Sequence, residues 1–385
     1  MQTAYGELCP PERLLLGPGP SNVDPRVLRA LSTPLLGHLD PAFLAIMDET
    51  MELLRTVFQT RNRFTIPVSG TGSAGMEAAL VNVLEPGDTA VVCVNGVFGE
   101  RMCDVAARCG AEVTRVDAEW GRAIDPGAVA SALRGKRPKV VAVVHAETST
   151  GVLQPVAEIG ALARQAGALF LVDTVTSLGG VPVCVDQWGA DVVYSGTQKC
   201  LSCPPGLAPI TFSERALEVV RARKTKVQSW YLDMTMIEKY WSGERLYHHT
   251  APISMNYALR EALRIVHEEG LEARFQRHRR NQEALLAGLE GMGLSLFADP
   301  AHRLPSLTTV WVPEGVEDGV VRKRLLDEFH IEIGGGLGPV KGKIWRIGLM
   351  GYASRPASVL AVLSALERIL GRSGGVAAAA EALRR

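Results

Sequence analysis

The sequence predicts an α/β protein in which helices cover both faces of a mostly parallel sheet. Short, continuous runs of Val, Ile and Leu recur along the chain, and helix-like segments separate them. Strands that are buried on both faces have this pattern. We expect an N-terminal arm over residues 1–17, a large α/β/α domain over 18–270 and a smaller α+β domain over 271–385.

The individual elements follow from local signals. Thr65–Val68 is predicted as a strand, Gly70–Gly75 as a loop and Met76–Leu84 as a helix, before a turn at Glu85–Asp88. Further strands are predicted at Thr89–Val94, Val140–Val144, Leu169–Val172 and Val192–Tyr194, with a helix at Val156–Gln165. A long helix, Met255–Glu269, leads to the smaller domain, where we predict a charged helix, strands around Thr308–Val312 and Ile344–Ile347, a helix from Pro356 and a short Ala-rich tail.

Composition narrows the possible partners and the compartment. The 385 residues carry 41 basic and 41 acidic side chains, which gives no basis for a nucleic-acid or membrane-surface partner. Seven cysteines without a disulfide pattern favour a reducing cytoplasm. The N-terminal residues lack the pattern of a signal peptide. No residue set predicts a metal site: Cys200 and Cys203 form a lone pair, and His248 and His249 should point to opposite sides of an extended chain.

A glycine-rich segment, Gly70-Thr-Gly-Ser-Ala-Gly75, follows a predicted strand and precedes a predicted helix. Backbone N–H groups at a helix N-terminus bind phosphate well. The pattern is that of a dinucleotide fingerprint, but Asp88, the acid that follows, lies in a turn. A cup for a single phosphate, assisted by Thr71 and Ser73, and a purely structural turn are the other interpretations.

Two residues that each follow a strand carry the chemistry. Asp173 ends one apolar strand, and Lys199 follows the next strand, about 25 residues further along the chain. Residues that follow strands at one edge of a sheet can face one another across a cofactor. A lysine amine can form a Schiff base with an aldehyde cofactor, and a carboxylate can keep a pyridine nitrogen protonated. These two groups are the minimum that a protein needs to use pyridoxal phosphate (PLP) as a cofactor. Arg346, on a predicted strand, could bind a substrate carboxylate, and Phe98 could stack on a flat ring.

Taken together, these motifs resemble the class V, fold-type I PLP aminotransferases, and most closely the alanine–glyoxylate and serine–pyruvate aminotransferases. The resemblance covers nearly the whole chain. It includes Leu14–Asn22, Ser69–Gly72, Ala78–Asp88, Ser149–Pro155, Val172–Gly180, Tyr194–Lys199, Tyr247–Thr250 and Gly335–Pro339. The resemblance implies a seven-stranded type of sheet, PLP as the cofactor and a homodimer with shared active sites.

The resemblance also implies a role for each matching residue. Lys199 would carry the cofactor as an internal aldimine and move the proton, and Asp173 would pair with the pyridine nitrogen. Arg346 would bind the substrate carboxylate, with Gly19 and Thr148 closing the pocket. The remaining cofactor contacts would come from Thr71, Gly72, Ser73, Phe98, Thr148, Val175 and Gln198, and from Tyr247 and Thr250 of the neighbouring subunit. Phe98 stands where related enzymes often carry Trp, and Ser73 where some carry His.

These roles predict ping-pong transamination between alanine or serine and glyoxylate or pyruvate. A ureidoglycine–glyoxylate aminotransferase shares nearly all of the motifs and remains an alternative. A dinucleotide-dependent dehydrogenase is the alternative from another class.

Overall fold

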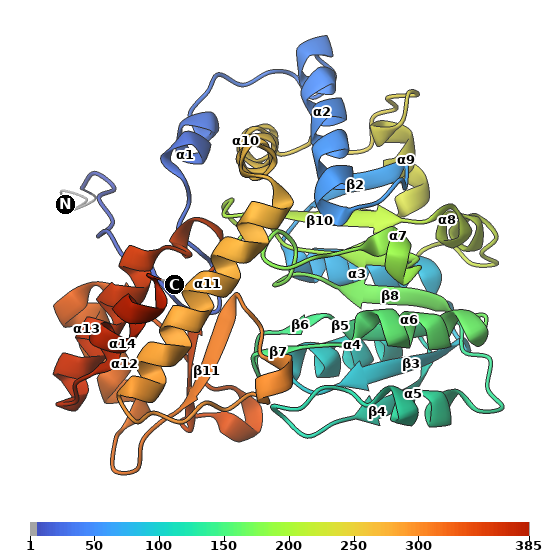
Figure 1. Ribbon diagram of the computed structural model, residues 1–385. Helices are drawn as coiled ribbons and strands as arrows, with labels where there is room; N and C mark the ends of the chain where they lie inside the picture. The colour runs from blue at the N-terminus through green and yellow to red at the C-terminus, as the bar shows by residue number, and fades with distance from the viewer. Residues whose placement is uncertain (1–5, 385) are drawn as a thin grey trace, which may run out of the picture.

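A seven-stranded sheet forms the centre of the computed structural model, which describes residues 6–384 (Figure 1). Neighbouring strands lie parallel except β10, which runs antiparallel to both of its neighbours. The order across the sheet is β2 (Phe64–Ser69), β10 (Leu207–Phe212), β9 (Val192–Tyr194), β8 (Leu169–Asp173), β5 (Val140–Val144), β3 (Thr89–Val94) and β4 (Glu112–Asp117). The predicted mostly parallel α/β sheet is confirmed.

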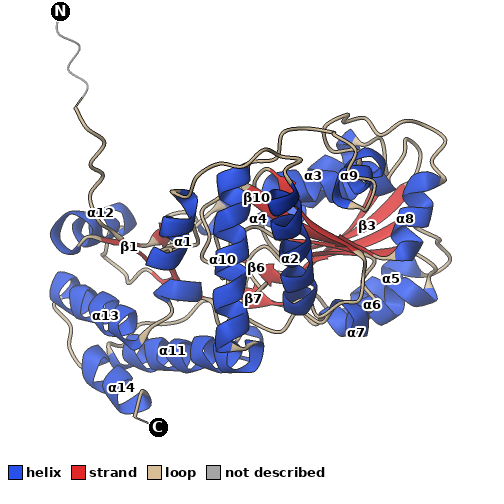
Figure 2. Ribbon diagram, turned by 90° about the horizontal axis from the view of Figure 1, so that it is seen from above, coloured by secondary structure: helices blue, strands red, loops and turns tan. Residues whose placement is uncertain are grey.

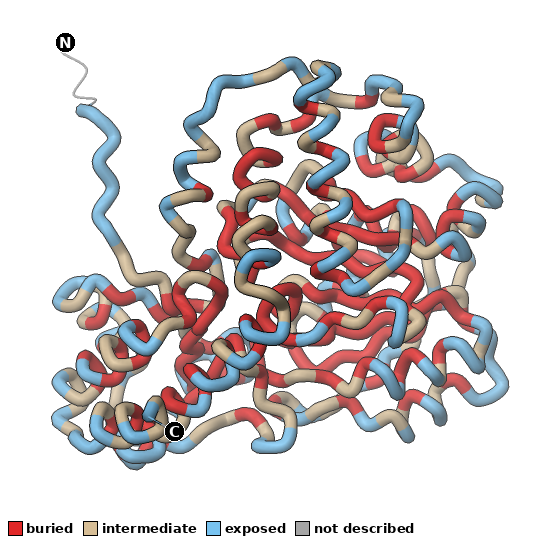
Figure 3. Tube along the Cα trace, turned by 45° about the horizontal axis from the view of Figure 1, so that its top comes forward, coloured by how far each residue is buried: buried red, intermediate tan, exposed pale blue. Residues whose placement is uncertain are grey.

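Two apolar layers hold helices against the two faces of this sheet (Figures 2 and 3). Successive residues of a strand serve opposite layers, as Val91 and Val92 of β3 do, because side chains alternate along a strand. One layer is covered by α3 (Gly72–Val83), α4 (Val97–Arg108), α8 (Glu214–Arg221) and α9 (Met234–Trp241). The other is covered by α5 (Pro126–Leu133), α6 (Val156–Gln165), α7 (Val185–Trp188) and α10 (Ile253–Glu269). Both layers include residues of α2 (Pro41–Phe58).

Asp-Pro pairs start three of the helices. Asp24, Asp40 and Asp125 each accept a hydrogen bond from the backbone N–H two residues later, and proline occupies the next position. An aspartate at the N-cap satisfies a free donor of the first turn, and proline there loses no helical hydrogen bond. These sequence signals fix the starts of α1 (Pro25–Leu31), α2 and α5.

A separate apolar cluster joins the C-terminal elements. They are α11 (Leu271–Gly291), β11 (Leu307–Trp311), α12 (Asp318–Phe329), β13 (Gly334–Gly335), β14 (Ile344–Gly348), α13 (Pro356–Leu370) and α14 (Gly375–Ala382). The strands form an antiparallel sheet in the order β11-β14-β13. The predicted domain boundary near residue 270 coincides with Gly270, between α10 and α11, and the division itself stays a prediction.

The N-terminal strand crosses to this C-terminal part of the molecule. β1 (Leu14–Leu15) pairs in parallel with β12 (Ile331–Glu332), so residues before the large sheet lie beside the last third of the chain (Figure 1). A short hairpin, β6 (Ala146–Glu147) with β7 (Val152–Leu153), follows β5. Within residues 6–384, no helix has the length and apolar character needed to cross a membrane.

One local prediction was wrong, and one segment was left without a predicted element. The segment Gly70–Gly75 was expected to be a loop, but α3 already begins at Gly72, because small residues there allow the helix to pack directly on the sheet. The Ala-rich tail, for which no secondary structure was predicted, forms α14, which packs against α11 and α13, since alanine favours helix and its small side chain allows close packing.

Candidate active site

The ends of three neighbouring strands bring the candidate residues to one edge of the large sheet. Val144 at the end of β5 pairs with Asp173 at the end of β8, and Asp173 pairs with Tyr194 at the end of β9. Ligand sites in open α/β sheets lie at the carboxyl ends of the strands. The register therefore places Asp173 where the sequence predicted it, between two polar loops.

Asp173 is a buried carboxylate with a fixed orientation. Its Oδ2 accepts a hydrogen bond from the Tyr194 hydroxyl at 2.7 Å, and its Oδ1 accepts one from the Val175 N–H at 2.8 Å. Burial raises the pKa of Asp173 to about 6, and the two hydrogen bonds and the charges of Lys199 and Arg101 oppose this rise. At neutral pH the group is thus an anion held by its neighbours.

Lys199 lies on the loop that leaves β9, with its amine at the carbonyl oxygen of Pro18. Burial, together with the charge of Arg346, lowers the pKa of Lys199 to about 8. A lowered pKa makes the neutral, nucleophilic amine accessible near neutral pH.

A glycine lets the N-terminal segment lie across this lysine. Gly19 has φ of 102°, and a Cβ atom there would stand 2.5 Å from Cδ of Lys199. Ser21 fastens the segment, because its Oγ donates to the Lys199 carbonyl at 2.7 Å and its N–H donates to the Gln198 carbonyl at 2.9 Å. The lysine loop and residues 18–21 therefore form one unit.

The N-terminus of α3 lies beside the lysine loop and has the character of an anion site. Thr71 is the N-cap residue, yet its side chain makes no capping hydrogen bond. A Cβ at Gly72 would stand 3.0 Å from Val175 Cγ2, so this helix start approaches the Asp173 loop closely. The buried Oε1 of Gln198 has no hydrogen-bond partner within residues 6–384. Free first-turn groups and nearby polar side chains suit a single phosphate.

Glu147 fixes the helix that carries Phe98. Its carboxylate accepts hydrogen bonds from the N–H of Phe98 at 3.1 Å and of Gly99 at 3.4 Å, in the first turn of α4. It also accepts one from the Ser149 hydroxyl at 2.6 Å. Burial raises the pKa of Glu147 to about 7. The residue holds Phe98 at the rim of the site, where the Arg101 guanidinium carbon lies 4.9 Å from the centre of the ring.

Arg346 brings a guanidinium group from β14 to the same site. Its Nε donates to the Gly335 carbonyl at 2.7 Å, and its Nη1 donates to the Thr148 carbonyl at 3.3 Å. The residue is 7% exposed, and burial lowers its pKa to about 10. Among the described residues, no carboxylate lies within 4.0 Å of it, so this buried cation is left for an anionic ligand.

Tyr247 and Thr250 lie on the surface of the chain. Tyr247 is 60% exposed, and its ring centre lies 5.1 Å from that of His38. Thr250 is also exposed. Between them, His249 Nε2 and the Ser69 hydroxyl are 2.8 Å apart, which places the segment near the residues that lead into α3.

The structure brings Lys199, Asp173, Arg346 and the start of α3 together, and it adds four residues that sequence reasoning missed. Those residues are Ser21, Arg101, Glu147 and Tyr194. Tyr194 had a detectable signal, since it ends the strand next to the one that Asp173 ends. Ser21 had none, because its contact spans 178 positions.

The expected orientation of the adjacent residues His248 and His249 was wrong. The Nδ1 atoms of His248 and His249 are 2.8 Å apart, so the expectation that the two rings point to opposite sides was wrong. The chain bends at this segment instead of extending. His145 packs on Trp188 with ring centres 4.7 Å apart, and burial lowers its pKa to about 3.

Comparison with known proteins identifies the class. Residues 14–353 match the model of the family "Aminotransferase class-V". The chain is 47% identical to the (S)-ureidoglycine–glyoxylate transaminase of Bacillus subtilis, over 98% of this chain and 95% of that protein, and the TM-score to a solved structure from that species is 0.97.

Two further relatives carry a different name. The alanine–glyoxylate aminotransferase of Rattus norvegicus is 45% identical over 94% of this chain and 88% of its own length. The solved structure of the Nostoc alanine–glyoxylate aminotransferase is 53% identical, with a TM-score of 0.94 over 96% of this chain and 98% of that chain. This chain belongs to the class V aminotransferases and has the fold of the fold-type I PLP enzymes.

The protein is therefore a PLP-dependent aminotransferase, and its residues fit this cofactor. The unpartnered Gln198 Oε1 and the uncapped start of α3 leave polar groups free for the cofactor phosphate, and Gly72 lets this helix start approach Val175 closely. The dinucleotide-dependent dehydrogenase, which the glycine pattern had left open, does not agree with this family.

Proposed function

We propose that the protein transfers an amino group from alanine or serine to glyoxylate or pyruvate by a ping-pong reaction. The observation that carries this proposal is the buried Arg346 guanidinium, which has no carboxylate partner in residues 6–384 and lowers the pKa of Lys199. A site with one such cation suits substrates that present one carboxylate.

Lys199 and Asp173 are the proposed catalytic residues. When bound, PLP supplies an electron sink that accepts the electrons of the Cα–H bond. The Lys199 amine would accept the proton from the substrate Cα and deliver it to C4′ of the cofactor, because its lowered pKa keeps a neutral fraction available. Asp173, held by Tyr194 and Val175, keeps the pyridine nitrogen protonated.

The other site residues bind and orient. Arg346 would hold the carboxylate of the amino acid and of the 2-oxo acid, and Gly19 and Thr148 would close the pocket around it. Phe98 and Val175 would contact the cofactor ring. The phosphate would be held by Thr71, Gly72, Ser73 and Gln198, all at or beside the N-terminus of α3.

A panel of amino donors and 2-oxo acids with purified enzyme tests the substrates. We expect alanine or serine with glyoxylate or pyruvate to give the highest kcat/KM. Ureidoglycine belongs in the panel as the second candidate donor, because the Bacillus subtilis relative is 47% identical over nearly the whole chain. A kcat/KM for ureidoglycine far above that for alanine and serine would replace the first proposal with the second.

The active enzyme is proposed to be a homodimer in which each subunit completes the other's site. The exposed side chains of Tyr247 and Thr250 support this, since they are free to reach the phosphate of a partner. Lys199→Ala chains mixed with Tyr247→Ala/Thr250→Ala chains would form heterodimers with one doubly damaged and one intact site. We expect about half of the wild-type activity per heterodimer, as one of two sites is restored.

Verified heterodimers that stay at the level of the parent homodimers would contradict this arrangement. We also propose a cytoplasmic location, which the seven free thiols support. Fractionation of cells that express the protein would test the compartment.

A further inference from the structure

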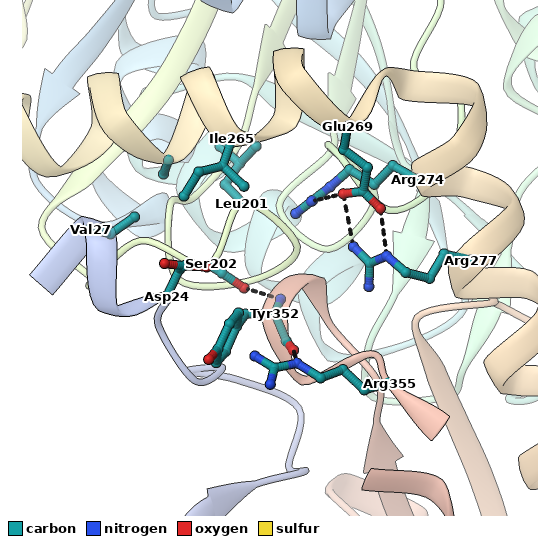
Figure 4. Close-up of a pocket in the computed structure, with 11 residues that line it drawn as sticks. Asp24, Val27, Leu201, Ser202, Ile265, Glu269, Arg274, Arg277, Tyr352 and Arg355 are labelled. Atoms are coloured by element: carbon teal, nitrogen blue, oxygen red, sulfur yellow. Dashed lines mark hydrogen bonds and ion pairs between the residues drawn. The ribbon is translucent and has the colours of Figure 1, made fainter. Parts of the chain in front are cut away.

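Three charged residues meet where α10 ends and α11 begins, outside the groups that the proposed function uses. Glu269 is the last residue of α10, and Arg274 and Arg277 lie in the first two turns of α11. Glu269 Oε2 accepts from Arg274 Nη1 at 2.6 Å, and Glu269 Oε1 accepts from Arg277 Nε at 2.5 Å (Figure 4). One carboxylate thus joins two guanidinium groups.

Arg274 holds the loop of the catalytic lysine. Its Nη2 donates to the carbonyl oxygen of Cys200 at 2.5 Å, and Cys200 directly follows Lys199. Its Nε donates to the Gly179 carbonyl at 2.8 Å. Arg274 is only 3% exposed, so these are buried, charge-assisted hydrogen bonds, which are stronger than neutral ones.

Arg277 holds the turn that follows the substrate-arginine strand. Its Nη1 donates to the carbonyl oxygens of Gly351 at 2.9 Å and Ser354 at 2.6 Å. This turn begins three residues after β14, the strand of Arg346. Neighbouring His278 adds a contact, since its Nε2 accepts from the Gly351 N–H at 2.9 Å.

Apolar packing also joins the two segments, since Cys200 of the lysine loop and Met350 of the turn belong to one buried apolar cluster. A cavity of about 240 Å³ lies beside the cluster, between Val27, Ile265 and Tyr352 (Figure 4). The Tyr352 N–H also donates to the Ser202 hydroxyl at 2.8 Å, which adds a hydrogen bond between the turn and the lysine loop. The polar contacts therefore act together with apolar packing between the lysine loop and the turn.

We propose that Glu269 is a positioning residue that sets Lys199 relative to Arg346, by holding Arg274 on the lysine loop and Arg277 on the turn after β14. This role rests on the proposed transamination, which needs the substrate carboxylate on Arg346 while Cα lies at the Lys199 amine. Misplacement of a reacting group by 1 Å can cost about a hundredfold in rate. A neutral residue at 269 leaves both arginines without their shared partner.

The test compares Glu269→Gln with Glu268→Gln, the neighbouring residue on the same helix. Glu268 pairs with Arg26 and Arg264 on the surface and touches neither arginine of the cluster. The holoenzymes are mixed with alanine in single turnovers, using alanine with hydrogen or deuterium at Cα. We expect Glu269→Gln to slow the reaction about ten- to a hundredfold and to raise the isotope effect, since proton transfer becomes the slow step.

We expect Glu268→Gln to behave as wild type and the KM for glyoxylate to change little in both variants, because Arg346 itself is retained. Arg277→Gln is a second test variant that should disturb folding less. The Arg277 side chain is 29% exposed, and Arg274 keeps its ion pair with Glu269 when Arg277 is replaced. It should raise the isotope effect in the same direction. A folded, cofactor-loaded Glu269→Gln enzyme with a rate within about twofold of wild type and an unchanged isotope effect would overturn the proposal.

If Glu269→Gln and Arg277→Gln both fail to fold while Glu268→Gln folds normally, the cluster only stabilises the fold, and the positioning proposal is overturned. A readout that needs no turnover separates this outcome from failure of the proposed function. The pH midpoint of the visible absorption band of the lysine-bound cofactor should depend on the distance between the Lys199 nitrogen and Arg346, because a nearby cation disfavours the protonated form of that nitrogen. It should shift in Glu269→Gln and not in Glu268→Gln, even if wild type accepted none of the substrates in the panel.

Discussion

Asp173 and Arg346 are both buried charged residues, but they differ in how the surrounding protein holds them. The carboxylate of Asp173 accepts hydrogen bonds from the next strand and from its own loop, all within the large sheet. The guanidinium of Arg346 contacts two carbonyl oxygens, one of them on the opposite side of the domain boundary predicted near residue 270. In the proposed site, the carboxylate that would face the cofactor is already held by hydrogen bonds. The guanidinium that would face the substrate has no carboxylate within 4.0 Å among residues 6–384, and Glu147 acts on its charge only from farther away.

The largest expected effect comes from the lysine that lies between these two charges. Lys199→Ala should lower kcat by about 10⁴-fold, because the covalent attachment and the proton carrier are lost together. Single turnovers with alanine measure the loss, and Lys226→Ala on the surface is the matched control. A Lys199→Ala enzyme with more than about a hundredth of wild-type activity would place the chemistry elsewhere.

Asp173→Asn tests whether the negative charge at this position is needed for catalysis. The amide should keep cofactor binding but lose about a hundredfold or more in kcat, since it cannot keep the pyridine nitrogen protonated, and each tenfold loss equals about 1.4 kcal/mol of barrier. Cofactor content and turnover are measured on the same sample. Near-normal turnover with bound PLP would show that the Asp173 charge is not needed.

Arg346→Ala tests whether this guanidinium binds the substrate carboxylate. We expect kcat/KM to fall by the equivalent of about 2–5 kcal/mol for the amino acid and the 2-oxo acid alike, because both present the same carboxylate to a desolvated cation. Steady-state kinetics with each substrate varied in turn give the two values. A fall for the donor alone would mean that Arg346 is not the shared anchor.

Tyr194→Phe removes one of the two hydrogen bonds to the Asp173 carboxylate and should have the smallest effect of the four variants. The tyrosine hydroxyl lowers the pKa of Asp173, which burial raises to about 6. Below that pH the carboxyl is protonated and cannot accept from the pyridine N–H, so binding of PLP to the cofactor-free chain should weaken as pH falls through about 6. Removing the hydrogen bond should move this weakening upward by roughly one pH unit. An unchanged pH profile of PLP binding would argue against coupling between the two residues.

The strands of the large sheet and the site residues that follow them were largely predictable from the sequence. The runs at Thr89–Val94, Val140–Val144 and Leu169–Val172 are strands as predicted, because strands buried on both faces need continuous apolar side chains. Once these strands are parallel, their ends share an edge, which brings Asp173 and the Lys199 loop together. The start of α3 follows from the glycine pattern, although the helix begins earlier than expected.

Other features depend on contacts that local sequence does not encode. β10 contains Pro209 within its apolar run, which argues against an interior strand, and its reversed direction depends on pairing with β2 and β9. Ser21, Glu147 and Glu269 act through partners far along the chain or across a helix end, and their residue types are ordinary surface types. Even the visible Asp-Pro helix starts show where α1, α2 and α5 begin but not what they pack against.

Borohydride reduction of the holoenzyme, followed by peptide mapping, tests most directly that Lys199 carries the cofactor opposite Asp173. Reduction makes the bond between lysine and cofactor permanent, so the modified residue can be located by mass. We predict a single pyridoxyl label on the peptide that contains Lys199, and none in the Lys199→Ala chain. A label on any other lysine of the wild-type enzyme would contradict the assignment of the active site.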